Sequence, residues 1–400
     1  MHTSLTIKTV SFDLTNPELI RDPYQYYKTI RETSPVFLSA PDNIYFLTRY
    51  TDICYALKTP TIFSSKGTAN ILQPAWLYDR GIKDYPIVFE DLPRHTIQRQ
   101  VIARAFTPKA ADRLALFIQQ LVEELISTIP PSSEIEFVTT FAQPLVDRTI
   151  FHHFGIDYND DRAVLFREWA GLIEDPPLVE SVAHKDRLDQ LNTLVSSFID
   201  STIESRQQSM GPDLVSDVVQ HTGLSLRDKS DLLEVLLLAA MQATPHVLSR
   251  AVLYLASHET LFQQLANNSA LIPDFIEELL RYDPPVHLVA RRTLEDTEVS
   301  GITLPKGVNI ILITASANRD SSRFMNPDSF DLHRTDHKHL AFSHGIHHCI
   351  GHAVARKILT ISLEALLSRF KNFNCPPRET LDWFYSYSVY GFRALPVMFK

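Results

Sequence analysis

The sequence predicts a mainly α-helical fold with small β-sheets, and three observations lead to this prediction. Glycine is scarce, with 11 residues in 400, whereas leucine, isoleucine and alanine are abundant, and this composition favours helices. The 24 prolines fall mostly between segments of helical periodicity, where they mark turns. A glycine-rich phosphate loop and an alternating β–α pattern are both missing, which disfavours a Rossmann fold or a β/α barrel.

Apolar residues recur at helical spacing in several segments, which we predict to be helices. These segments are 110–129, 187–206, 226–258, 273–282 and 350–370. Segment 226–258 follows Ser225, a residue type that favours helix N-termini. Because its middle is apolar on nearly all sides, we expect it to run through the core.

Fewer segments have the pattern of strands. Val36–Leu38 and Ile44–Leu47 flank a turn at Pro41–Asn43 and predict a hairpin. Further strands are predicted at Val299–Leu304, Val308–Ile313, Val389 and Ala394–Phe399. The predicted sheets are therefore small and lie near both ends of the chain.

Charge and cysteine content argue against several protein classes. The 38 Lys and Arg residues against 47 Asp and Glu residues give a net charge of −9, which argues against a nucleic-acid-binding protein. Three cysteines imply no disulfide framework and favour a reducing, cytoplasmic setting. The N-terminus shows no signal-peptide core, and the longest apolar run, Val235–Met241, is too short to cross a membrane. We expect a soluble protein without membrane contact.

The most informative segment runs from Leu340 to His352 and places Cys349 directly before an apolar helix. Amide groups at a helix N-terminus lower the pKa of a thiol and stabilise a thiolate. A buried structural cysteine is one explanation. Zinc is a second, because several histidines crowd around Cys349, although no second cysteine completes a tetrahedral site. The third is haem iron bound by a single thiolate, which fits an open loop before a helix.

The pattern Phe342-x-x-Gly345-x-His347-x-Cys349-x-Gly351 resembles the haem-binding signature of the cytochrome P-450 family. The resemblance covers most of the chain and is closest to the soluble bacterial members. It implies that haem b is the cofactor and that Cys349 binds its iron. The remaining residues of the pattern are then expected to surround the haem.

The resemblance also implies a fold, a triangular helical prism around a buried haem. It implies one cytochrome P-450 domain over residues 1–400, with a β-rich N-terminal portion at about 30–60 and a helical, haem-binding portion at about 90–400. Glu278 and Arg281 match the family's Glu-x-x-Arg motif, and Arg334 resembles the second arginine of that ion-pair cluster. Their expected role is structural, beneath the haem.

Four further residues match the family's contacts to the two haem propionates. His95 and Arg99 lie four residues apart and therefore face one side of a helix. Arg291 and His347 match two more of these contacts. Four donors for two carboxylates is a sound electrostatic arrangement.

The sequence departs from the family in the long central helix. The family presents an acid followed by an alcohol over the iron, and Gln242 and Ala243 stand in those places. Gln242 cannot ionise and Ala243 cannot form a side-chain hydrogen bond. Thr244 points about 100° further round the helix, and Pro245 should kink it and free a carbonyl for an ordered water. His246 lies one turn on and could reach the pocket.

This departure leaves the function open between several classes. The leading prediction is a monooxygenase that oxidises a small or medium organic, secondary-metabolite-like substrate with dioxygen. The electrons are expected from a ferredoxin or flavodoxin with its reductase, and indirectly from NAD(P)H. One alternative is an atypical enzyme that performs coupling, nitration, cyclisation or peroxide-driven oxidation, and another is a non-catalytic haem sensor or ligand carrier.

The resemblance also predicts which surfaces meet substrate and partner. The expected substrate-pocket residues are Ile71, Leu72, Trp76, Tyr78, Ile82, Tyr85, Ala239, Val286, Leu288, Val289, Tyr387 and Val389. Basic residues expected on the Cys349 side are Arg99, Arg104, Lys109, Arg356 and Lys357. A basic patch of this kind on an acidic protein would attract an acidic electron donor.

Overall fold

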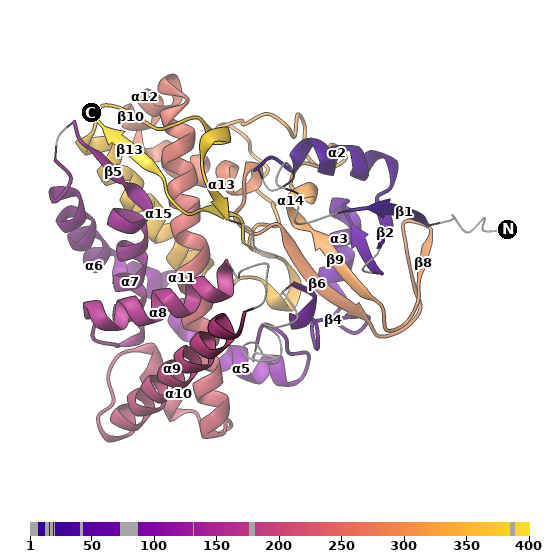
Figure 1. Cartoon of the computed structure of the whole chain (residues 1–400), viewed down its shortest axis with the longest axis horizontal. Helices are drawn as coiled ribbons and strands as arrows, with labels where there is room; N and C mark the ends of the chain where they lie inside the picture. Colours follow the sequence, from indigo (N-terminus) through magenta and orange to yellow (C-terminus); the bar gives the residue numbers. More distant parts are fainter. Residues whose placement is uncertain are drawn as a thin grey trace.

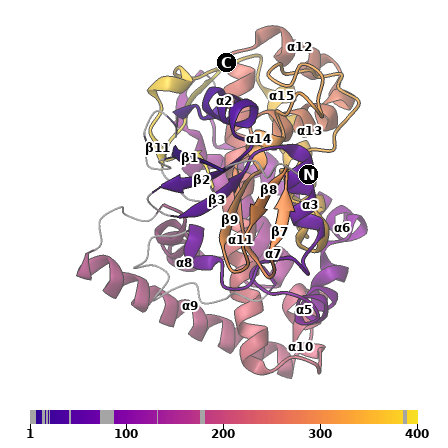
Figure 2. The same cartoon turned by 90° about the vertical axis from the view of Figure 1, so that its right-hand side faces the viewer.

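A computed structural model describes the chain except for residues 1–6, 13–15, 17–18, 20, 41–42, 73–86, 131, 176–180 and 385–388. Most helices lie on one side of the molecule, and the six-stranded sheet lies on the other side with the helices of residues 24–33, 50–58 and 314–317 (Figure 1). Figure 2 shows the side with the sheet. Among the described residues, helices contain many more residues than strands do, so the predicted fold class is confirmed.

The helices are named by their place along the chain. They are α2 Tyr24–Thr33, α3 Tyr50–Lys58, α5 Arg94–Ala103, α6 Pro108–Ser127, α7 Gln143–Phe154, α8 Asp160–Glu174, α9 Val182–Gln208, α10 Leu214–Gln220, α11 Leu226–Ala256, α12 Glu259–Asn267, α13 Ile272–Tyr282, α14 Thr314–Ala317 and α15 His352–Arg369. The five predicted helices correspond to α6, α9, α11, α13 and α15, with ends that differ by a few residues. The largest difference is in α9, which begins five residues earlier because Ser181 caps it by accepting a hydrogen bond from the His184 amide.

The larger sheet has the strand order β1-β2-β3-β9-β6-β4. Its strands are β1 Lys8–Ser11, β2 Val36–Ala40, β3 Ile44–Leu47, β4 Phe63–Ser64, β6 Leu288–Thr293 and β9 Asn309–Ile313. The predicted hairpin is confirmed, because β2 and β3 pair antiparallel with Phe37 opposite Phe46. β3 pairs parallel with β9, so strands far apart in sequence form one sheet.

Three smaller sheets complete the β-structure of the described residues. They use β5 Glu134–Glu136, β7 Thr297–Val299, β8 Ile302–Leu304, β10 Phe373–Asn374, β11 Trp383–Phe384, β12 Gly391–Phe392 and β13 Pro396–Phe399. The single strand predicted at Val299–Leu304 is wrong. Ser300 and Gly301 both have positive φ, 49° and 77°, so the chain turns back there and β7 pairs antiparallel with β8.

Helix α11 runs through the helical side of the molecule in both views (Figures 1 and 2). The expected cap is confirmed, since the Ser225 hydroxyl accepts from the Asp228 amide and the Asp228 carboxylate accepts from the Ser225 amide. α11 is long and apolar enough to cross a membrane by length and composition, but 78% of its most apolar window is buried inside the protein. Its apolar surface therefore packs against neighbouring helices, as expected for a core helix.

Candidate active site

The loop that carries Cys349 is closed by its own backbone and packed against α3. The Cys349 amide donates to the Phe342 carbonyl oxygen over 2.8 Å. Gly345 has a φ of +72°, and a Cβ added to it would lie 2.1 Å from the Leu57 carbonyl oxygen of α3. Only glycine fits this close approach, which explains its place in the motif. The loop then enters α15 at His352 and holds Cys349 just before the helix.

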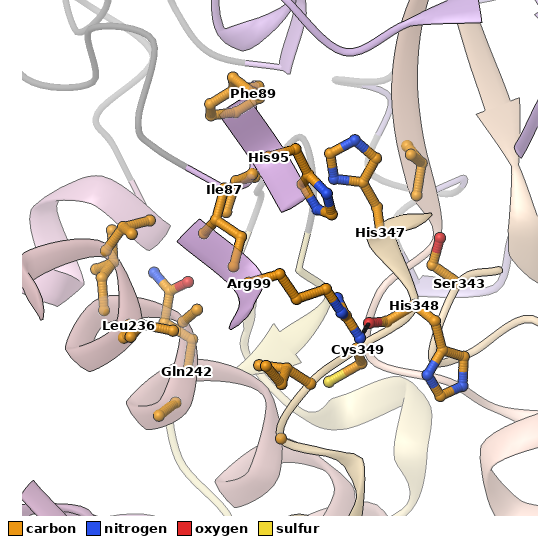
Figure 3. A pocket seen from close by; sticks show the side chains of 18 of the residues that line it. Ile87, Phe89, His95, Arg99, Leu236, Gln242, Ser343, His347, His348 and Cys349 are labelled. Carbon is orange, nitrogen blue, oxygen red and sulfur yellow. Dashed lines mark hydrogen bonds between the residues drawn. The ribbon is translucent and has the colours of Figure 1, made fainter. Parts of the chain in front are cut away.

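A cavity of about 410 Å³ lies beside this loop. Its walls come from the Cys349 loop, α5, the middle of α11, the end of α8 and β6. Cys349 and Gln242 both line it, from the loop and from α11 (Figure 3). Sequence segments more than 100 residues apart therefore meet around one space.

The thiol of Cys349 sits among groups with opposing effects on its pKa. Burial raises that pKa above the ordinary value, while the amides of Gly351 and His352 and the cations Arg99 and Arg356 favour the thiolate. The amide effect expected from the sequence is present, but burial outweighs it. A cation bound at the sulfur would offset the cost of burying the thiolate.

Four basic groups converge on the same cavity, namely His95, Arg99, Arg291 and His347. The rings of His95 and His347 lie with centroids 4.4 Å apart, and Arg99 donates from Nη2 to the His348 carbonyl oxygen over 2.8 Å (Figure 3). Burial and nearby arginines lower the pKa of His95 to about 4 and that of His347 to about 2. Burial also lowers the pKa of Arg291 to about 10.

This donor set fits haem b. The Nε2 atom of His95 is buried without a hydrogen-bond partner among the described residues. A neutral imidazole can donate from this atom, and the cations Arg99 and Arg291 line the same cavity, so the set accommodates carboxylates such as the haem propionates. Gly351 also lines the cavity, and a Cβ added there would meet nothing within 4 Å, so the wall beside Cys349 is open to a flat group. Phe342 and Gly345 of the motif shape the loop without lining the cavity.

A buried ion-pair cluster supports the site from α13. Arg281 donates from Nε and Nη2 to the two carboxylate oxygens of Glu278, each over 2.7 Å. Arg334 donates from Nε to Glu278 Oε2 over 3.0 Å. The structure thus brings together the three residues that the sequence grouped. Arg281 also donates to the carbonyl oxygens of Asn318, Pro327 and Ser329, which ties α13 to the segment before the Cys349 loop.

On α11, the residues at the family's acid and alcohol positions are placed differently. Gln242 lines the cavity, whereas Ala243 and Thr244 are not among the described residues that line it. The helix continues through Pro245. The sequence predicted a freed carbonyl that could hold a water, but Gln143 Nε2 of α7 donates to the Met241 carbonyl oxygen over 3.2 Å. A side chain therefore satisfies this carbonyl.

Gln143 also donates to Asp147 Oδ1 over 2.7 Å, and Arg167 Nε lies 3.3 Å from Asp147 Oδ2. Burial nevertheless raises the pKa of Asp147 from 3.8 to about 7. Between about pH 4 and pH 7 the folded protein holds a proton on Asp147 that the unfolded chain has lost. The contribution of protonated Asp147 to the free energy of unfolding is therefore fully present below about pH 4. It falls as the pH rises toward about 7 and is lost above about pH 7.

We expect Asp147→Asn to remove this pH dependence. When the pH is raised from 5 to 8, the free energy of unfolding of the wild type should fall relative to that of the variant. The expected change in this difference is on the order of 2–4 kcal/mol, because one pKa unit corresponds to about 1.4 kcal/mol. Urea unfolding at both pH values measures the difference. Parallel stability changes in the two proteins would show that Asp147 does not titrate as described.

His246 points away from its expected place in the cavity. Its Nε2 donates to Glu174 Oε1 over 3.0 Å, and its side chain is 7% exposed. His246 itself does not line the cavity, but Glu174, the last residue of α8, does. Glu174 was not predicted as a site residue, because no local pattern in the sequence connects it with a residue 72 positions later.

The expected substrate-pocket residues have mixed outcomes. Ala239, Leu288 and Val289 line the cavity. Ile71 and Val286 do not, because Ile71 packs in the core with Leu288 and Val286 forms a backbone bridge with Val389, which is likewise absent from the lining. Trp76, Tyr78, Ile82, Tyr85 and Tyr387 lie outside the described residues, and the side chain of Leu72 is not described. Thr68, Phe89, Phe106 and Ile173 were not predicted and line the cavity.

Comparison with known proteins gives consistent matches along the chain. The family model for cytochrome P-450 matches residues 40–389. The chain is 28% identical over 415 residues to the biotin biosynthesis cytochrome P-450 of Bacillus subtilis (strain 168), covering 98% of this chain and 100% of the relative. It is 30% identical over 393 residues to cyclomarin C epoxidase CymV of Salinispora arenicola (strain CNS-205), covering 95% and 96%. The crystal structure of P-450BioI, in complex with an acyl carrier protein ligated to hexadec-9Z-enoic acid, has a TM-score of 0.87 and 25% identity, covering 96% and 99%.

Proposed function

The chain belongs to the cytochrome P-450 family, and from this premise we propose that it is a monooxygenase for a small or medium-sized organic substrate of biosynthetic origin. The observation that carries the proposal is the cavity shared by Cys349, the four basic groups and the apolar middle of α11. The named activities of the relatives, in biotin biosynthesis and in cyclomarin C epoxidation, support a biosynthetic substrate.

The residues that would hold haem b are Cys349 at its iron and His95, Arg99, Arg291 and His347 at its propionates. When bound, haem supplies the iron that activates dioxygen. The chain's own contribution is to position the thiolate in a loop that packs closely against α3 at Gly345. Apolar residues of α11 and β6 line part of the cavity, among them Leu236, Ala240 and Leu288. Such walls orient an organic substrate and exclude water.

Proton delivery distinguishes this chain from the family pattern. Gln242 faces the cavity but cannot ionise, and Ala243 provides no hydroxyl. A positioned proton donor typically contributes about 10²- to 10⁴-fold in rate. We therefore infer that productive turnover depends on hydroxyl groups of the substrate itself, so the set of well-coupled substrates is narrow. The atypical chemistries, coupling, nitration, cyclisation and peroxide-driven oxidation, are the competing functions that this same observation favours.

We propose that electrons arrive from NAD(P)H through a ferredoxin or flavodoxin and its reductase, in the cytoplasm. Arg104 and Lys109 are exposed near the N-terminus of α6, and α6 packs against α15, the helix that follows the Cys349 loop. Two other members of the expected basic patch are engaged, since Arg356 pairs with Glu277 and Lys357 with Asp112. Arg104 and Lys109 are therefore the cations offered to an acidic partner.

The test of this function is the ratio of product formed to NAD(P)H consumed, with a surrogate ferredoxin and reductase. We expect weak coupling with generic substrates, and a several-fold higher ratio in the double variant Gln242→Glu/Ala243→Thr, which restores the acid and the alcohol. Tight coupling of the wild type with several unrelated substrates would contradict the inferred dependence on substrate hydroxyls. Faster turnover with peroxide alone would favour the peroxide-driven alternative.

Arg291→Ala is expected to lower haem retention, because it leaves a buried propionate unpaired. Loss of one partner of a buried ion pair costs about 3–5 kcal/mol of stability. Under dialysis against apomyoglobin, the variant should therefore lose its haem, whereas the wild type should retain it. The haem content per protein, measured as the pyridine haemochromogen, reports the loss. Arg292→Ala is the matched control, since Arg292 is the next residue on β6 and is exposed. Equal haem content in both variants would remove Arg291 from the propionate site.

A further inference from the structure

The cavity contains one acidic residue among the described residues that line it, and this residue is Glu174. The basic groups of the cavity belong to the side of Cys349, where they are assigned to the haem propionates. Ile173 precedes Glu174 in the lining, and α11, which carries the partner His246, contributes the apolar residues Val235, Leu236 and Leu238. A carboxylate in such surroundings has a strong effect on which ligands enter, because few other polar groups compete with it.

Hydrogen bonds at Glu174 and at the following residue hold Glu174 in position. Its Oε1 accepts the 3.0 Å hydrogen bond from His246 of α11. The next residue, Asp175, is bound by Arg393, with Nε donating to Oδ2 over 2.7 Å, and Arg393 also donates to Asp382 over 2.9 Å. The end of α8 is thus held at a side chain and at its following residue. Glu174 is a preorganised group and pays little conformational entropy on binding a ligand.

One oxygen of Glu174 is still available to a ligand. Among the described residues, Oε2 has no hydrogen-bond or ion-pair partner, and the side chain is 15% exposed. A carboxylate accepts up to about four hydrogen bonds, so the single bond from His246 leaves most of its capacity unused. Glu174 lines the cavity, whereas its partner His246 does not.

We propose that Glu174 is a substrate-recognition residue that selects ligands with an apolar body and a cationic end group. This inference rests on the proposed function, because it takes the cavity to be the substrate site. Glu174 attracts the cationic group, while the apolar walls accept the body of the ligand and direct it toward Cys349. Ligands that end in a carboxylate are repelled by the same group.

The experiment compares three probes of equal chain length by calorimetric titration of the haem-containing protein. The probes are octyltrimethylammonium, octanol and octanoate, and the quaternary ammonium is chosen because its nitrogen cannot coordinate iron. We expect the wild type to bind the cation at least about tenfold more tightly than octanol, and octanoate most weakly. Glu174→Gln should abolish the tenfold preference and leave the affinity for octanol within about twofold.

Two control variants separate recognition from structure. Glu168→Gln removes an acid from the same helix that pairs with Arg187 and does not line the cavity, so the preference should persist. His246→Gln keeps a donor to Glu174 and keeps the carboxylate, so the preference should also persist. If Glu174→Gln no longer binds octanol, Glu174→Asp is measured instead, and its preference for the cation should be reduced but present.

A wild type without preference for the cation overturns the inference, as does a preference that Glu174→Gln retains. Failure of the proposed function would look different. In that case the probes would bind with the expected order, but the reductase-supported protein would form no oxidised product from any bound substrate.

Discussion

Replacing Cys349 by serine is expected to abolish the thiolate-type absorption band of the reduced carbon monoxide complex, and with it monooxygenase turnover. A serine hydroxyl is a far weaker ligand for iron than a thiolate, and the loss of an outer-shell partner already costs about 10- to 100-fold in metal-site activity. The loss of the iron ligand itself should lower activity by more than 100-fold. The spectrum of the purified variant, recorded after reduction under carbon monoxide, gives the answer directly.

Cys375→Ser is the matched control for this experiment. Cys375 is half-buried, and burial raises the pKa of its thiol to about 12, so it is an inert thiol that does not line the cavity. The control should keep both the band and the turnover. An unchanged band in Cys349→Ser, or its loss in Cys375→Ser, would show that the iron ligand has been assigned to the wrong cysteine.

The motifs that the sequence revealed are those in which neighbouring residues act together. The Cys349 loop is one example, because its glycine, its cysteine and the following helix lie within a dozen residues. Glu278 and Arg281 are another, as they are three residues apart on one helix and meet in the structure. The resemblance to the family predicted that Gln242 lies over the iron, and Gln242 lines the cavity.

The features that the sequence did not reveal depend on long-range packing. Helical arithmetic allowed His246 to face the cavity, but its ring turns to Glu174, which α8 delivers from 72 residues away. The Met241 carbonyl was expected to hold a water, yet Gln143 of α7 reaches it. The hairpin at Ser300–Gly301 was not predicted, because the apolar residues on both sides have the pattern of one continuous strand. Each case required knowledge of which element packs beside another.

The second large effect is expected from Glu278→Gln. Glu278 and Arg281 have side chains that are 1% exposed, and that of Arg334 is 8% exposed, so the substitution leaves two buried guanidinium groups without their anion. Removal of one partner from a buried pair costs about 3–5 kcal/mol, a large part of the total stability of a typical domain. We expect a matching fall in the free energy of unfolding measured with urea, together with a loss of bound haem. Glu124→Gln is the control, because Glu124 is 57% exposed where it pairs with Arg148, and exposed pairs contribute at most about 1 kcal/mol.

The reason for the size of this effect is that Glu278 organises more than one contact. Its Oε1 also accepts a hydrogen bond from the Asp331 amide over 2.8 Å, so the carboxylate holds a backbone segment as well as two arginines. Arg281→Lys should be nearly as harmful as Glu278→Gln, since a lysine cannot donate to both carboxylate oxygens and to three carbonyl groups at once. If either variant unfolds with less than about 1 kcal/mol of loss, water must reach the cluster, and the segment before the Cys349 loop must be held by other contacts.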